Sequence, residues 1–109
     1  MANPFRGEAN FRAGATTYTL TFDVNVFVEI EEATGLGFKS LIAEIQGDPS
    51  FRLMREVVTA GLQTKHAGTS KHDVGNIMSD AGMDVIGDAI KKAITACVPK
   101  ANGGSGDPR

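Results

Sequence analysis

The chain has few of the residues on which disulfide-rich folds and stacking surfaces are built. Among its 109 residues there are one cysteine, one tyrosine and no tryptophan. The single cysteine, Cys97, cannot form an internal disulfide, so the fold is expected not to depend on one, and a reducing compartment fits best. The shortage of aromatic rings argues against a surface on which nucleic-acid bases stack.

A strong charge of one sign and long apolar runs are also missing. Lysine and arginine number 11 against 13 aspartates and glutamates, which leaves a formal net charge of −2. We expect no nucleic-acid partner, because neutralising phosphates requires a basic face. No apolar run approaches the ~20 residues of a membrane span, and the first residues lack the apolar core of a signal peptide. We therefore expect a cytoplasmic protein with no membrane partner.

The start of the chain predicts a β-hairpin. Residues 16–22 alternate threonines with larger apolar and aromatic side chains, and this period of two is typical of a half-buried strand. Residues 8–12 supply the first strand, with Phe11 on its buried face, and Gly14 can adopt the positive φ of a tight turn. Because an isolated hairpin is marginally stable in water, other elements must cover its apolar face.

The rest of the chain predicts helices. Residues 24–34 alternate as a strand would, but a helix is favoured because Asp23 is a good N-cap and Gly35 a good terminator. Apolar residues then recur at the helical spacing i, i+3, i+4, i+7. Four further helices are expected: from Phe38 to Gly47, from Asp48-Pro49 to about Lys65 with a buried stripe that starts at Phe51, from a Ser70–Asp73 capping box to Gly82, and from Asp84 to Val98.

These segments predict an α+β fold, with an N-terminal β-hairpin packed on a bundle of four to five short helices. A single domain is expected over residues 8–98, after an N-terminal arm of residues 1–7. Residues 99–109 are rich in glycine, serine and proline, and we expect them to form a disordered tail.

No group of residues predicts catalysis. Cys97 falls on the apolar stripe of the last helix and is expected to be a buried structural thiol. His66 and His72 flank a polar loop, but a metal site needs three or four ligands on a rigid frame, so both are expected to be solvated. We expect no enzymatic activity, no cofactor and no metal.

The helical stripes are the remaining functional signal. Methionine is adaptable and common on surfaces that accept a partner, although filling gaps in a core is its more frequent role. Arg52, Arg55 and Lys65 form a small basic face, which is typical of a solvated surface or a partner contact. Partner binding is predicted for six residues: Phe38, Leu41, Ile45, Met54, Met78 and Met83.

The order of short motifs along the chain resembles a known family. The motifs are Arg6-Gly7-Glu8, Tyr18-x-Leu20-x-Phe22, Glu31-Glu32 closed by Gly35, Ala60-Gly61-Leu62 and Asp73-Val74-Gly75-x-Ile77-Met78-x-x-Ala81-Gly82-Met83. Over roughly residues 5–98 the chain is similar to the small tail proteins of gene transfer agents and of related long-tailed phages and prophages. That family is labelled tail tube protein or tail assembly chaperone. The segment after Pro99 is not shared.

The resemblance implies a virion-morphogenesis protein in the cytoplasm of a bacterial host. Family members that act as assembly chaperones are described as binding the tape measure protein and helping tail-tube subunits polymerise around it. A homo-oligomer is compatible with this role. Two alternatives stay open: a structural tail-tube subunit, which would be largely β and virion-associated, and a cytoplasmic protein-binding module unrelated to phage tails. The family has no catalytic motif whose residues could be carried over.

Overall fold

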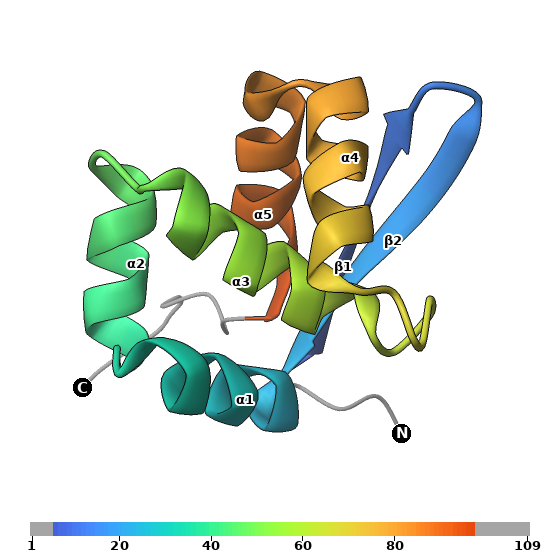
Figure 1. The fold of residues 1–109 in the computed structure, drawn as a ribbon. Coiled ribbons are helices and arrows are strands. Elements are labelled where there is room, and N and C mark those ends of the chain that lie inside the picture. Colours follow the sequence, from blue (N-terminus) through green and yellow to red (C-terminus); the bar gives the residue numbers. More distant parts are fainter. Residues whose placement is uncertain (1–5, 98–109) are drawn as a thin grey trace.

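A two-stranded antiparallel hairpin begins the fold, and five helices follow it (Figure 1). The computed structural model describes residues 6–97. The elements are β1 (Arg6–Ala13), β2 (Thr16–Asp23), α1 (Val24–Thr34), α2 (Phe38–Gln46), α3 (Phe51–Leu62), α4 (Lys71–Ala81) and α5 (Met83–Cys97). The predicted α+β fold of a hairpin packed on helices is confirmed. Residues 1–5 and the expected tail, 99–109, lie outside the described residues.

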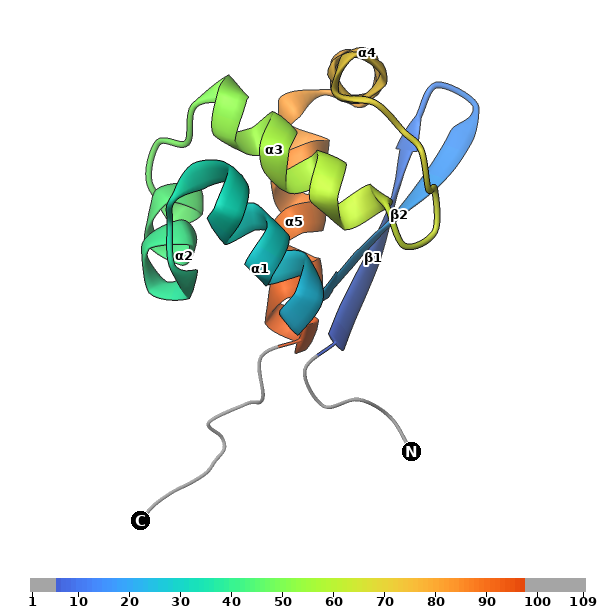
Figure 2. The ribbon, with the colours of Figure 1, turned by 60° about the horizontal axis from the view of Figure 1, so that its bottom comes forward.

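The helices are arranged around α3. This helix contacts α1 on one side and α4 on the other, and it also packs on β2. Helix α5 lies along β1 and reaches β2 as well, so the apolar face of the hairpin is covered mainly by α3 and α5 (Figure 2). None of the helices within residues 6–97 is long and apolar enough to cross a membrane.

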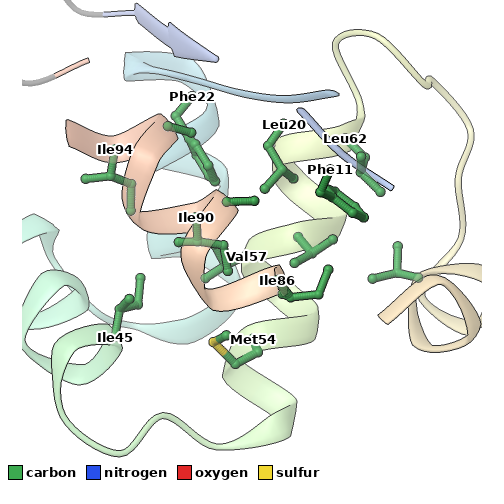
Figure 3. Packing of buried hydrophobic residues seen from close by; sticks show 14 of the residues in the cluster. Phe11, Leu20, Phe22, Ile45, Met54, Val57, Leu62, Ile86, Ile90 and Ile94 are labelled. Atoms are coloured by element: carbon green, nitrogen blue, oxygen red, sulfur yellow. The ribbon is translucent and has the colours of Figure 1, made fainter. Parts of the chain in front are cut away.

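The hairpin forms where its alternation predicts. Gly14 has a φ of 62° in the turn between the strands, a conformation that costs glycine little. The register places Phe11 opposite Tyr18, and their rings stack with centroids 5.6 Å apart. Leu20 and Phe22 are fully buried beneath the helices (Figure 3).

The first strand begins at Arg6 rather than at residue 8, so the expected arm of residues 1–7 is too long. The reason is a close contact at Gly7, which is buried against the last turns of α5. A Cβ atom added there would lie 2.1 Å from the carbonyl oxygen of Ala93 and 2.5 Å from the amide nitrogen of Cys97. Because β1 packs on α5 backbone to backbone, its pairing with β2 extends to the Arg6–Asp23 pair.

Helices α1 and α4 have the expected caps. The Asp23 carboxylate accepts a hydrogen bond from the backbone N–H of Val26 at 2.9 Å, and Gly35 ends α1 in the left-handed region. At the start of α4, Ser70 and Asp73 each accept a hydrogen bond from the other's backbone N–H. This reciprocal pair is the predicted capping box.

Helix α3 is shorter at both ends than expected. It begins at Phe51 because the Ser50 hydroxyl, not Asp48, caps it by accepting a hydrogen bond from Leu53 N–H at 3.0 Å. It ends at Leu62, three residues before the expected end near Lys65. Phe51, expected at the start of the buried stripe, is instead 75% exposed. Helix α5 spans Met83–Cys97 and begins one residue earlier than expected, while its expected end at Val98 lies outside the described residues.

Candidate functional site

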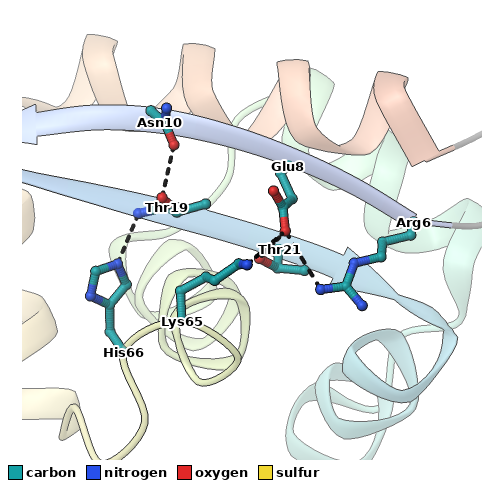
Figure 4. Close-up of polar contacts among 7 residues, drawn as sticks. All are labelled: Arg6, Glu8, Asn10, Thr19, Thr21, Lys65 and His66. Carbon is teal, nitrogen blue, oxygen red and sulfur yellow. Dashed lines mark hydrogen bonds and ion pairs between the residues drawn. The ribbon is translucent and has the colours of Figure 1, made fainter. Parts of the chain in front are cut away.

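The loop between α3 and α4 is attached to the free edge of β2. His66 Nε2 accepts a hydrogen bond from the backbone N–H of Thr19 at 3.0 Å (Figure 4). The centroid of the His66 ring lies 5.2 Å from that of the Tyr18 ring. A neutral imidazole is required, because only an unprotonated nitrogen can accept this bond. The sequence predicts that His66 is a solvated loop residue. It instead accepts a hydrogen bond from a backbone N–H that would otherwise be unpaired at the edge of the sheet.

A polar network covers the second face of the hairpin. Glu8 Oε2 accepts a hydrogen bond from the fully buried Thr21 hydroxyl at 3.3 Å. The same carboxylate lies 3.5 Å from the Arg6 guanidinium and 3.7 Å from Lys65 Nζ, as Figure 4 shows. Each of these side chains has a partner in the network, which connects the two strands of the hairpin with the loop between α3 and α4.

The other candidates for chemistry are inert or scattered. Cys97 is fully buried, as predicted, and its thiol donates to the carbonyl oxygen of Ile94 at 3.1 Å. Burial raises the pKa of this thiol to about 11, so at neutral pH it is not a nucleophilic thiolate. His72 is exposed on α4. Within residues 6–97, no three histidine, cysteine, aspartate or glutamate side chains are grouped so that they could hold a metal ion.

A hollow in the described surface, the α3–α4 groove, lies between α3 and α4. It encloses about 640 Å³ and is lined by Phe51, Arg52 and Arg55 of α3, by Gly75, Met78 and Ser79 of α4, and by Gly82 and Met83 where α4 meets α5. Its floor is apolar, and three of its lining positions are glycine or serine. A Cβ atom added at Gly75 or Gly82 would contact nothing within 4 Å. The groove can therefore admit the backbone of another element.

The two sides of this groove differ in charge. Arg52 and Arg55 line one side, and neither forms an ion pair with any residue in the described part of the chain. The neighbouring Glu56 does not compensate them, because it is paired with Lys71 at 2.8 Å. Beyond Phe51 and Met83, an adjoining hollow is lined by three aspartates, Asp48, Asp84 and Asp88, and by Lys91. The surface thus runs from a basic side through an apolar part to a hollow whose lining is acidic on balance.

The six residues predicted to bind a partner occupy different positions. Leu41, Ile45, Met54 and Met78 are buried in the core, and Met83 is half-buried. Phe38 is 36% exposed and packs edge-on against Phe27 with ring centroids 5.0 Å apart. Only Met78 and Met83 line the α3–α4 groove. Their binding role stays a prediction, and most of the set contributes to packing in this conformation.

Sequence reasoning missed Phe51, the most exposed aromatic residue within residues 6–97. Its spacing from Met54 and Val58 places it on the buried stripe of α3, which is why it was assigned to the core. Its position at the first residue of the helix was the available signal, because a stripe can extend past the elements that cover it.

A second exposed apolar strip lies on α1, where Val24 and Val28 are 55% and 45% exposed.

Comparisons with known proteins found no match. No family model matches this chain, and neither a curated protein nor a solved structure is significantly similar to it.

Proposed function

We propose that this protein binds an amphipathic helix of another protein, and that it does so as an assembly chaperone of a phage-like tail. The observation that carries the proposal is Phe51, an aromatic residue that is 75% exposed at the mouth of an apolar groove. The motif order described above supports the tail context. The partners proposed on that basis are the tape measure protein and the tail-tube protein of a gene transfer agent or prophage.

The shape and composition of the groove favour a helix as the occupant. Helix-in-groove recognition uses apolar anchors that enter a hydrophobic depression between helices. Here Met78 and Met83 line that depression, and methionine side chains adapt to different anchors. The small residues Gly75 and Gly82 let a partner backbone approach closely. A chaperone that must cover several apolar segments of one long partner would need such adaptable contacts.

The secondary structure supports a chaperone over a tube subunit. A tail-tube subunit is expected to be largely β, whereas residues 6–97 contain one two-stranded sheet and five helices. Only two strands leave little edge for the sheet-to-sheet contacts of a tube ring. The third alternative, a binding module unrelated to tails, makes the same use of the groove and differs only in its partner.

Co-purification tests the proposal. A tagged fragment of the tape measure protein encoded in the same gene cluster is co-expressed with this protein, and the complex is captured on the tag. We expect the wild-type protein to be retained and the Phe51→Asp variant to be lost. Val28→Asp is the matched control, because it places the same charge on an exposed apolar residue of α1, away from the groove.

Two results would contradict the proposal. If the wild-type protein is not retained by the tape measure fragment, the tail role is wrong. If Phe51→Asp is retained as well as Val28→Asp, the groove is not the binding surface. A genome in which no tail genes surround this gene would favour the unrelated binding module.

A further inference from the structure

We infer that the α3–α4 groove selects helices that carry carboxylates one turn away from their apolar anchor. This inference rests on the proposed function, since it names the chemistry of the helix that the same groove binds. The occupant is a partner helix with glutamate or aspartate beside its anchor, and the residues that select it are Arg52 and Arg55.

The position of Arg52 and Arg55, and their lack of ion-pair partners, support this inference. They are three positions apart on α3, so they lie on the same side of the helix. Both line the groove, and neither has an ion-pair partner within residues 6–97. Glu56 is committed to Lys71 at 2.8 Å. Glu44 and Glu56 line an adjoining hollow together with Arg52, but no ion pair within residues 6–97 neutralises either arginine.

Phe51, which would contact the apolar anchor of the partner helix, lies close in sequence to both arginines. Phe51 precedes Arg52 directly and Arg55 by one helical turn. A partner residue that contacts Phe51 and Met83 would therefore have its neighbours one helical turn away near the guanidinium groups, at i+3 and i+4 or at i−3 and i−4 according to the direction of the partner helix. Guanidinium groups bind carboxylates with two parallel hydrogen bonds, and this geometry distinguishes a carboxylate from other polar groups.

The charge of the adjoining hollow gives the bound helix a direction. The hollow beyond Phe51 and Met83 is lined by Asp48, Asp84 and Asp88 and by one lysine, Lys91, so its lining carries more negative than positive charge. Of the three aspartates only Asp88 has an ion-pair partner in the described part of the chain, Lys92 at 3.1 Å. Carboxylates at that end of the partner would meet like charge, which disfavours the reversed orientation. The groove thus favours a helix with its acidic residues on one side of the anchor and neutral or basic residues on the other.

One other occupant has similar chemistry, and the experiment must separate it. Helix α1 of a second copy carries the exposed Val24 and Val28 on the same element as Glu31 and Glu32. Docking of α1 into the groove of another copy would be a head-to-tail contact, which leads to rings or filaments. Such self-association is the alternative outcome of the experiment.

The test uses two synthetic peptides of about 18 residues, long enough to form a marginally stable helix. Both carry the same stripe of leucines, flanked by glutamates in one peptide and by lysines in the other. Binding to the full-length protein is measured by fluorescence anisotropy at low and high salt. We expect the glutamate peptide to bind about tenfold more tightly at low salt, with a smaller preference at high salt because exposed charges are screened.

Charge reversal supplies the matched controls. Arg52→Glu with Arg55→Glu is expected to reverse the preference toward the lysine peptide. Arg12→Glu with Lys39→Glu makes the same change in net charge at two exposed residues outside the groove, and it is expected to leave the preference unchanged. Circular dichroism of both double variants checks that they fold.

The outcomes separate this inference from the proposed function. Equal binding of the two peptides, or a preference that Arg52→Glu with Arg55→Glu does not alter, overturns the inference while the groove remains a helix site. Failure of both peptides to bind overturns it too, even if the tape measure fragment is still captured. If light scattering shows an oligomer of the wild-type protein that the same double variant dissociates, the occupant is a second copy. Loss of tape measure capture alone overturns the proposed function.

Discussion

The two halves of α3 carry the same apolar stripe but have different surroundings. The C-terminal half, with Val58 and Leu62 fully buried, packs on the hairpin, and a Cβ atom at Gly61 would lie 3.0 Å from Leu20. The N-terminal half begins with Phe51, 75% exposed, above the α3–α4 groove. The periodicity of apolar residues therefore predicts which residues share a face of a helix, whereas the neighbouring elements decide whether that face is covered.

The largest expected effect lies in another covered part of the fold, at Gly7, where β1 packs on α5. Gly7→Ala would place a methyl group 2.1 Å from the Ala93 carbonyl oxygen, and because this is backbone, neither side can move without cost. We expect the free energy of unfolding to fall by about 3 kcal/mol or more. Urea denaturation measures the change. An unchanged midpoint would contradict the close packing of β1 on α5.

The buried thiol predicts a pH dependence of similar size. Burial raises the pKa of Cys97 from an ordinary value of 9.0 to about 11 in the folded protein. Above pH 9 the unfolded chain releases this proton while the folded chain retains it, so stability falls as the pH rises from 9 to 11. Each pH unit costs about 1.4 kcal/mol. Urea titrations at several pH values should show this slope in the wild-type protein.

Cys97→Ala is the control for that slope. The variant is expected to be less stable at neutral pH, because it loses packing in the core. Its stability should nevertheless show a weaker decline between pH 9 and 11 than that of the wild-type protein. Equal slopes would mean that other groups cause the alkaline loss of stability.

A smaller effect is expected at the edge of the hairpin. His66→Ala removes the acceptor for the Thr19 N–H, which leaves a partly buried donor without its partner. We expect a loss of about 1–2 kcal/mol. Hydrogen exchange should also accelerate at the Thr19 amide more than at the amides of Leu20 and Phe22. Unchanged exchange at Thr19 would show that His66 does not protect this edge.

The smallest effect on stability is expected at Gly75, which lines the α3–α4 groove. A Cβ atom there contacts nothing within 4 Å, so Gly75→Ala should stabilise α4 by about 0.5–1 kcal/mol through its higher helix propensity. Gly75→Leu should preserve folding but fill the groove and reduce binding of the tape measure fragment. Urea denaturation and the capture assay measure the two effects. Destabilisation by Gly75→Ala would contradict an open groove.

Local signals predicted much of the fold. Asp23, Gly35 and the Ser70–Asp73 pair cap helices through contacts within a few residues, and such contacts can be deduced from neighbours in the sequence. The alternation in β2 similarly predicted the hairpin. The start of α3 was misplaced because Ser50 and Asp48 are both good caps, and only the three-dimensional path of the chain selects between them.

Long-range contacts were not predictable in the same way. His66 lies 47 residues from Thr19, so no local pattern connects the imidazole with the open edge of β2. The groove depends on how α4 and the start of α5 pass beside α3, which the sequence does not specify locally. Arg52 and Arg55 were identified as a basic face, but the hollow that they line became visible only in the fold.

The most direct test of the account is nuclear magnetic resonance mapping of the bound surface. The isotopically labelled protein is titrated with an unlabelled tape measure fragment, and the backbone amide shifts are followed. We expect the largest changes around residues 51–55 of α3 and 75–83 of α4 and α5, with little change at the hairpin turn near Gly14. Changes confined to the exposed face of α1, or spread over the hairpin, would contradict a binding site in the α3–α4 groove.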